Sequence, residues 1–178
     1  VAPHAMYTCS FDYLKNCSNL AKKLNIPVHM HFCENLDEVK GIKEKYQKKP
    51  VEVLKDIGLL DNKLILAHST FIDDDELDIL KNYDVSFVTN PISNLNLGCG
   101  IANISKYQNY VNICLGTDGQ GSGNNLNMFY HMSVTDLLQK GLYKDPKIMS
   151  SYDILKMATI NGAKALGMEH IIGSVEIG

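Results

Sequence analysis

Polar and apolar residues alternate with a period of two along residues 27–34, PVHMHFCE. Such alternation is typical of a strand, in which successive side chains point to opposite faces. The apolar residues would share one face, and His29 and His31 would share the other. Glu34 follows three residues after His31, where the strand should run out into a loop. This pair has the chemistry of a metal ligand beside a proton-transfer group, although one His near one Glu is also common on ordinary surfaces.

Three further stretches have strand patterns: KLILAHS (63–69), DVSFVTN (84–90) and VNICLGTDG (111–119). The first has the near-continuous apolar run of a strand that is covered on both faces. Residues 1–6 have the pattern of a fifth strand that ends near Ala2 and runs into a loop. We therefore expect about five strands.

Helical spacing of apolar residues separates these strands. The expected helices are 11–24, 36–46, a short one that begins at Pro50, 73–82, 101–110, 125–140 and 153–166. The polar, glycine-bearing stretch SNLNLGCG is expected to be a loop. Most aromatic residues, Phe87 and Phe129 among them, are expected in the core, and His131 at the surface or at a helix end. Strands that alternate with helices predict a parallel sheet with covering helices.

Four ionisable residues fall at or just after the expected strand ends: His4, His31, His68 and Asp118. In a (β/α)8 TIM barrel such residues converge at the mouth, whereas an open sheet would spread them along its edge. A whole barrel needs eight strands and about 250 residues. The sequence therefore predicts an α/β fold in which residues 1–170 form strands 4–8, the C-terminal half of a barrel. Residues 171–178 would begin a β-type segment outside it.

The bulk composition narrows the functional classes. The net charge of −3 and the pI of about 6.1 argue against a nucleic-acid partner. No apolar run reaches the ~18 residues that a membrane span needs. The five cysteines include no CxxC pair, so we expect reduced thiols in a cytoplasmic protein. The chain begins at Val1 without a Met, which suggests a piece of a longer protein.

Ordinary explanations exist for the later candidates. His68 is equally compatible with a helix cap or a core histidine, and Asp118 with an Asx turn in GTDG. The glycine-rich stretch that follows does not match a phosphate loop, which needs a Gly-Lys-Ser/Thr ending. Nor does it match a nucleophile elbow, because Gln120 and Asn124 occupy the required glycine positions around Ser122. Taken together at successive strand ends, the candidates favour a mononuclear metal hydrolase.

Longer motifs carry a family resemblance: APHAMYTCS, VHMHFCE, LILAHSTFI, VTNPISNLNLGCGIANI, ICLGTDGQGSGNNLNMF and MATINGAKALGM. In this order they resemble the amidohydrolase superfamily, and within it most closely the 5′-methylthioadenosine/S-adenosylhomocysteine deaminases. Guanine deaminases and triazine chlorohydrolases are the next most similar. The resemblance implies a barrel with one divalent metal, zinc or in some relatives iron. It also implies hydrolytic release of ammonia from an adenine-type nucleoside or another heterocyclic amine.

The resemblance further implies roles for individual residues. His31 would bind the metal, and Asp118 would bind the metal, take the proton of the attacking water and contact the substrate. Glu34 would contact the substrate and protonate its ring nitrogen. His68 would polarise or orient the water, and His4 would contact the substrate.

Two departures limit these implications. The first-strand HxH that supplies two metal ligands in the family is absent, so the chain offers two ligands where a catalytic zinc usually has at least three. Half a barrel would also expose strand edges, which invite pairing with the missing N-terminal half or with a second copy. We therefore expect the isolated chain to be inactive. A non-catalytic barrel fragment that serves as an assembly module is the alternative hypothesis.

Overall fold

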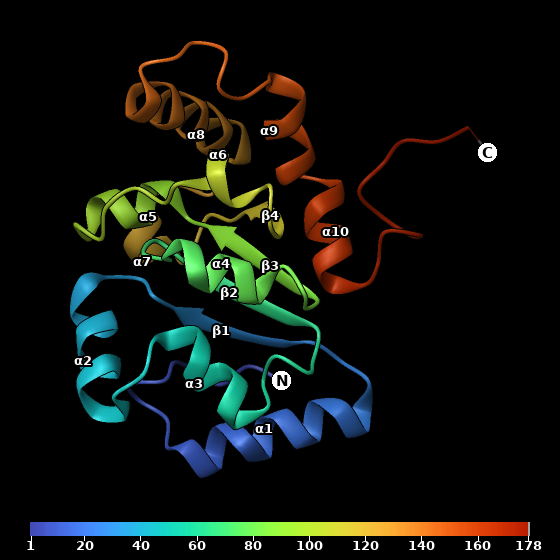
Figure 1. Cartoon of the computed structure of the whole chain (residues 1–178). Coiled ribbons are helices and arrows are strands. Elements are labelled where there is room, and N and C mark those ends of the chain that lie inside the picture. The colour runs from blue at the N-terminus through green and yellow to red at the C-terminus, as the bar shows by residue number, and fades with distance from the viewer. Residues whose placement is uncertain (178) are drawn as a thin grey trace.

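The structure, a computed structural model, describes residues 1–177. A sheet of parallel strands lies at its centre, and the spatial order of the strands follows the chain (Figure 1). The strands are β1 Val28–Phe32, β2 Leu64–His68, β3 Val85–Thr89 and β4 Asn112–Leu115. Each connection between them contains helix, as parallel neighbours require. The four internal strands expected from the sequence are all present.

Helices surround this sheet within residues 1–177. They are α1 Phe11–Leu24, α2 Leu36–Tyr46, α3 Pro50–Ile57, α4 Asp74–Leu80, α5 Pro91–Asn96, α6 Ile104–Tyr107, α7 Gln120–Gly123, α8 Met128–Tyr143, α9 Ser151–Met157 and α10 Ile160–Leu166. Ser10, as predicted, caps α1 by accepting a hydrogen bond from the Tyr13 amide at 3.2 Å. The helix α3 begins at Pro50, and Gly58 is its C-cap, with a φ of 81° that suits glycine.

The two faces of the sheet differ in chemistry because the strands pair in register. One row is fully apolar and buried: Met30, Leu66, Phe87 and Ile113. The neighbouring row on the other face contains His31, Ala67, Val88 and Cys114. In β1 the apolar residues are buried while His29 is exposed and His31 half-buried, as the alternation predicts.

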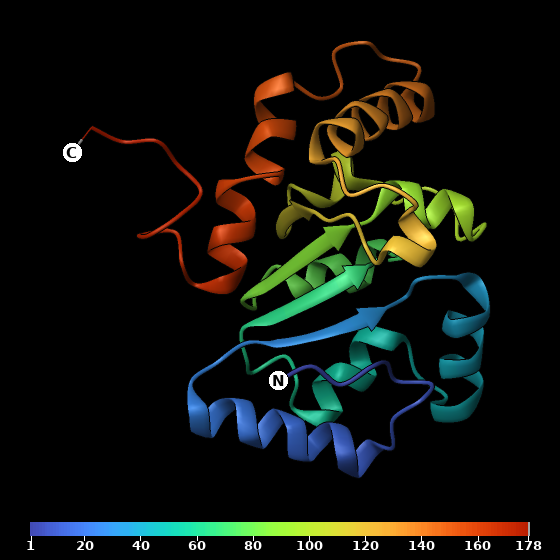
Figure 2. The same ribbon diagram turned by 180° about the vertical axis from the view of Figure 1, so that it is seen from behind.

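The N-terminal segment runs beside β1 as an extended edge (Figure 2). The Val1 amino group donates to the Pro27 carbonyl at 2.9 Å, and the His29 amide donates to the Val1 carbonyl at 2.9 Å. The His31 amide then donates to the His4 carbonyl at 2.9 Å. These bonds place His4 next to the outer edge of β1, where the sequence predicts the end of a preceding strand.

Three local predictions were wrong. SNLNLGCG was expected to be a loop, but its first residues belong to α5, which Pro91 opens. The expected helix 101–110 is only the single turn of α6. The expected helix 153–166 is divided into α9 and α10 at Thr159, whose φ of −134° and ψ of −98° lie outside the helical region.

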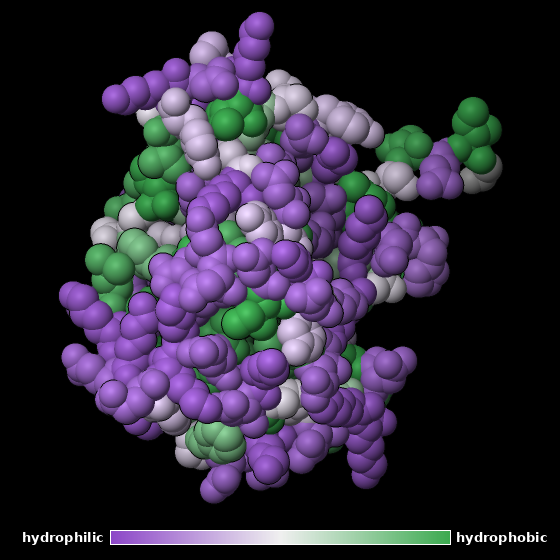
Figure 3. Space-filling model, in the orientation of Figure 1, coloured by the Kyte–Doolittle hydropathy of each residue, from purple (hydrophilic) through white to green (hydrophobic). Residues whose placement is uncertain are grey.

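The burial of two α8 residues also differs from expectation. His131 lies near the start of α8, at a helix end as one alternative expected, but it is fully buried and not at the surface. Its Nε2 bonds the Asn125 carbonyl at 2.8 Å, which ties the start of the helix to the preceding loop. Phe129 is 78% exposed. Figure 3 shows green, apolar surface at its left, on the side where Figure 1 places α5 and α8. The exposed apolar residues in and next to these two helices include Leu95, Leu97, Leu126, Phe129 and Leu137.

The residues after α10 extend away from the body of the molecule (Figures 1 and 2). Val175 and Ile177 are fully exposed there, and no strand occurs in residues 171–177. Gly178, the last residue of the β-type segment expected at 171–178, lies outside the described residues. That segment stays a prediction, as does the boundary at residue 170. In the part of the chain that the structure describes, no helix is long and apolar enough to cross a membrane, and the cysteines are free thiols.

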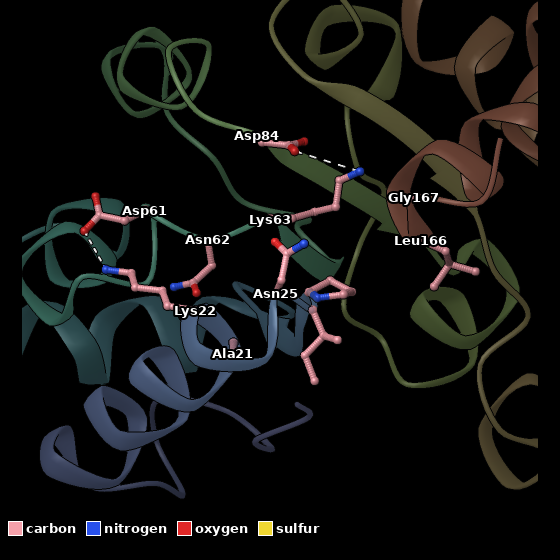
Figure 4. Close-up of a pocket in the computed structure, with 11 residues that line it drawn as sticks. Ala21, Lys22, Asn25, Asp61, Asn62, Lys63, Asp84, Leu166 and Gly167 are labelled. Carbon is pink, nitrogen blue, oxygen red and sulfur yellow. Dashed lines mark hydrogen bonds and ion pairs between the residues drawn. The ribbon is translucent and has the colours of Figure 1, made fainter. Parts of the chain in front are cut away.

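A cleft of about 520 Å³ opens between α1 and α10 (Figure 4). Pro27, Lys63 and Asp84 line it, and each directly precedes a strand. The cleft therefore lies at the amino ends of the strands. The predicted site residues lie at the opposite, carboxyl ends.

Candidate active site

The backbone turns sharply where the strands end. Cys33, just after β1, has φ of 47°; His68, the last residue of β2, has φ of 72°; and Asp118, after β4, has φ of 58°. Non-glycine residues in this left-handed region cost about 1–3 kcal/mol each and persist only where surrounding contacts fix them. Such positions often occur at functional sites. Two of them, His68 and Asp118, are site residues predicted from the sequence, whereas Cys33 is buried in the apolar core.

The histidines at this edge are brought together. The rings of His31 and His68 stack with centroids 5.4 Å apart and 19° between their planes. The His4 ring lies 4.8 Å from that of His31 and bonds Thr8 Oγ1 at 2.7 Å through Nδ1. His68 is buried, and its Nδ1 bonds Asn94 Oδ1 at 2.8 Å. Because an amide oxygen only accepts, His68 Nδ1 carries the proton and its Nε2 is left with the lone pair.

Glu34 lies beside this cluster. Its Oε1 is 3.9 Å from His68 Nε2, and its side chain is 15% exposed. The Cys99 thiol donates to the same oxygen at 3.6 Å. The structure therefore places the expected proton-transfer carboxylate next to the expected water-orienting histidine.

Asp118 is fixed as an ionised carboxylate. Burial tends to raise the pKa of Asp118, but the hydrogen bonds from the Ser93 hydroxyl and the Gly119 amide, with help from Ser122, lower it overall. The Ser93 hydroxyl donates to Oδ2 at 2.6 Å, and the Gly119 amide donates to Oδ1 at 2.6 Å. A carboxylate that accepts several hydrogen bonds favours its charged form.

One helix connects these two parts of the site. Ser93 and Asn94 are consecutive residues of α5; the first bonds Asp118 and the second bonds His68. Both are buried, although they are polar. Asn90 caps this helix, and a side chain at Gly116 would collide with its amide oxygen. The sequence did not single out Ser93 and Asn94, because their stretch has the composition of a polar loop, although it belongs to one of the motifs that carry the family resemblance, VTNPISNLNLGCGIANI.

His31 and Asp118 offer donor atoms of the kind that a divalent metal binds. His31 Nδ1 bonds the His4 carbonyl at 3.0 Å, so Nδ1 holds the proton and Nε2 has its lone pair free. A metal-binding histidine usually makes this kind of bond through its other nitrogen. Asp118 adds an ionised oxygen donor. The donors fit in kind but not in number, because no three His, Cys, Asp or Glu side chains in residues 1–177 gather into a metal site.

The model of the amidohydrolase family matches residues 1–178. The chain belongs to the amidohydrolase family. The resemblance inferred from the motifs is thereby confirmed, and the parallel sheet described above is part of a (β/α)8 barrel of this family.

Curated and solved relatives give the same result. A 5-methylthioadenosine/S-adenosylhomocysteine deaminase of Pyrococcus abyssi is 45% identical over 170 residues, which cover 95% of this chain and 40% of the relative. The structure of an adenosine deaminase from Xanthomonas campestris with bound zinc matches with a TM-score of 0.94 and 36% identity, over 99% of this chain and 40% of that one. Guanine deaminase of E. coli matches with a TM-score of 0.88 and 30% identity, over 99% and 41%. The chain thus spans about 40% of the length of these proteins.

Proposed function

We propose that the full-length protein containing this chain is a metal-dependent hydrolytic deaminase of adenine-type nucleosides, such as methylthioadenosine or S-adenosylhomocysteine. The observation that carries the proposal is the gathering of His31, Glu34, His68 and Asp118 at the carboxyl ends of parallel strands. In barrel enzymes this end of the strands carries the active site. The similarity to adenosine-type deaminases supports the substrate class.

Each residue has a role that its contacts support. Asp118, held ionised, takes the proton of the attacking water. His68 is protonated at Nδ1 by its bond to Asn94, so its Nε2 lone pair orients that water. Glu34 protonates the ring nitrogen beside the attacked carbon. It then takes the proton of the newly added hydroxyl and passes it to the leaving amine, so that a carbonyl forms and neutral ammonia departs. His4, at the rim, contacts the substrate.

His31 Nε2 and Asp118 are the groups of this chain that would hold the metal. When bound, a divalent metal lowers the pKa of water so that hydroxide is available near neutral pH. Zinc is the first candidate because a similar deaminase structure contains it. Iron is the second, because imidazole ligands suit both metals.

The remaining ligands would come from outside this chain. We propose that the N-terminal half of the parent barrel supplies them and covers the exposed strand edges, and that a second copy of the chain is the other possible cover. The isolated 178 residues should accordingly release no ammonia above a buffer control. Measurable turnover by this chain alone would contradict the proposal that part of the active site lies outside it.

Guanine is the second candidate substrate, because guanine deaminase matches nearly the whole chain in structure. The test is ammonia release by the full-length protein from methylthioadenosine, S-adenosylhomocysteine, adenosine, guanine and a chlorotriazine. We expect turnover of the adenine-type nucleosides and its loss in Asp118→Ala and Glu34→Gln. Turnover of guanine or the triazine alone would mean that the substrate is that compound's class and not the adenine-type nucleosides. Full activity of Asp118→Ala would contradict the proposed site, and no turnover of any compound would favour the assembly module.

A further inference from the structure

Glu34 is held at two points, through its main chain and through its side chain. We propose that Glu38 and Cys99 are positioning residues for Glu34: Glu38 fixes the backbone from which its side chain extends, and Cys99 fixes the direction of its carboxylate. This inference rests on the proposed function, because it deepens the proton-transfer role given to Glu34. Neither residue was identified from the sequence.

Glu38 lies in the first turn of α2 and is 6% exposed. Its Oε2 accepts the Glu34 amide at 2.8 Å, while its own amide donates to Asn35 Oδ1 at 2.9 Å. In the usual capping box the third helical residue bonds the N-cap amide. Here the bond goes to the residue before the N-cap, so the helix fixes the active-site carboxylate's own peptide. This choice is costly, because Glu38 Oε1 is buried without a hydrogen-bond partner in residues 1–177.

Cys99 reaches the other end of Glu34 from the turn after α5. Cys99 is 6% exposed, its thiol donates to Oε1 at 3.6 Å, and the same oxygen lies 3.9 Å from His68 Nε2. Burial, and then the neighbouring Glu34 carboxylate, raise the pKa of Cys99 to about 11, so the thiol stays protonated and remains a donor at neutral pH. With Oε1 accepting from Cys99, Oε2 is the oxygen left for a substrate proton.

The chain offers a matched control for each residue. Glu76 is also buried and caps a helix, accepting the Val51 and Asp73 amides at 3.1 Å, but it caps α4. Cys17 is 6% exposed, like Cys99, but lies in α1. Variants at these control positions remove the same chemistry without removing a contact to Glu34.

The test compares two leaving groups in the full-length protein. Ammonia needs a proton to leave, whereas chloride departs with the electron pair of the C–Cl bond and takes none. Loss of the Glu34 proton should therefore lower kcat on a 6-aminopurine nucleoside more than kcat on its 6-chloro analogue. The ratio of these two kcat values in Glu34→Gln is the reference for the other variants. We expect Glu38→Ala and Cys99→Ala to lower kcat on the amine roughly 10- to 100-fold, with a smaller loss on the chloride.

Conservative variants should restore the function. Glu38→Gln keeps an acceptor oxygen, and Cys99→Ser keeps a donor, so both should recover most of kcat. Glu76→Ala and Cys17→Ala should leave the ratio between the two substrates unchanged. Equal losses on both substrates in Glu38→Ala and Cys99→Ala would mean a merely structural role and would overturn the proposal.

An infrared measurement keeps the inference testable if a variant fails to fold or if the parent is not a deaminase. The S–H stretching band of Cys99 is assigned in full-length protein by its loss in Cys99→Ser. We expect this band to shift in Glu34→Gln, because the charged acceptor is removed. An unchanged band would overturn the Cys99 part whatever the activity. Absent turnover with a shifted band would instead reject the proposed function and leave the thiol–carboxylate contact supported.

Discussion

The rings of His31 and His68 stack on each other although the two residues occupy positions of neighbouring strands that point to opposite faces of the sheet. His31 pairs with Ala67, whereas His68 pairs with Phe32, so alternation alone would place His68 on the apolar face with Leu66. The φ of 72° at His68 takes the residue out of the extended strand, and its ring stacks on His31 at 5.4 Å. The convergence of the site therefore depends on backbone conformation at the strand end as well as on strand order.

The same type of strain at Asp118 predicts an unusual order of stability among its variants. Its φ of 58° suits glycine and is unfavourable for alanine. Both variants lose the bonds to Ser93 and Gly119, but Asp118→Gly also relieves the strain. Allowing for the greater freedom of glycine in the unfolded chain, we expect Asp118→Gly to be more stable than Asp118→Ala by about 0.5–1 kcal/mol. Urea unfolding of both variants measures this, and an equally stable Asp118→Ala would mean that no strain is present.

Asn94 should matter for both stability and turnover. Its buried amide oxygen accepts the proton of His68 Nδ1 at 2.8 Å. Asn94→Ala would leave that N–H buried without an acceptor, which costs about 1–3 kcal/mol. It would also free the ring to change tautomer, so we expect lower kcat in the full-length protein. Asn96→Ala is the control on the same helix: its side chain bonds the Ser122 carbonyl at an exposed position, so the change in stability should stay within about 0.5 kcal/mol.

The buried Glu38 makes stability depend on pH. Burial is the main cause that raises the pKa of Glu38 above its ordinary value of 4.5. The folded state therefore binds the proton more tightly than the unfolded state, and ionisation lowers the free energy of unfolding as pH rises through this range. Glu38→Gln lacks this proton, so its stability relative to the wild type should increase from acid to neutral pH. Chemical unfolding at several pH values checks the sign, and a constant difference would mean an ordinary pKa.

Two phenylalanines test where the core lies. Phe87 is 1% exposed in the middle of β3, whereas Phe129 is 78% exposed on α8. Phe87→Ala should therefore cost about 3–5 kcal/mol, and Phe129→Ala should change stability by no more than about 0.5 kcal/mol. Thermal or urea unfolding of the two variants measures both values. A large loss in Phe129→Ala would mean that another surface covers α8 in the protein used.

The sequence was sufficient for the strands and for the residues at their ends, because period-two alternation and the turn residues that stop it are local signals. The sequence was insufficient to predict which polar side chains are buried, because their burial depends on partners that are distant in the sequence. Ser93 and Asn94 looked like loop residues since they are polar, yet they are buried because they bond Asp118 and His68. His131 was expected at the surface or at a helix end because it is polar; it lies near the start of α8 but is buried. The break at Thr159 was missed because apolar spacing continues across it.

The central claim is that this chain holds part of a metal-dependent active site and that the rest lies outside it. Metal content, measured by elemental analysis on the full-length protein and on the isolated 178 residues, tests this most directly. We predict about one zinc or iron per full-length chain, far less in His31→Ala and Asp118→Ala of that protein, and far less in the isolated chain. A full-length protein without metal, or one that keeps it in both variants, would contradict the account.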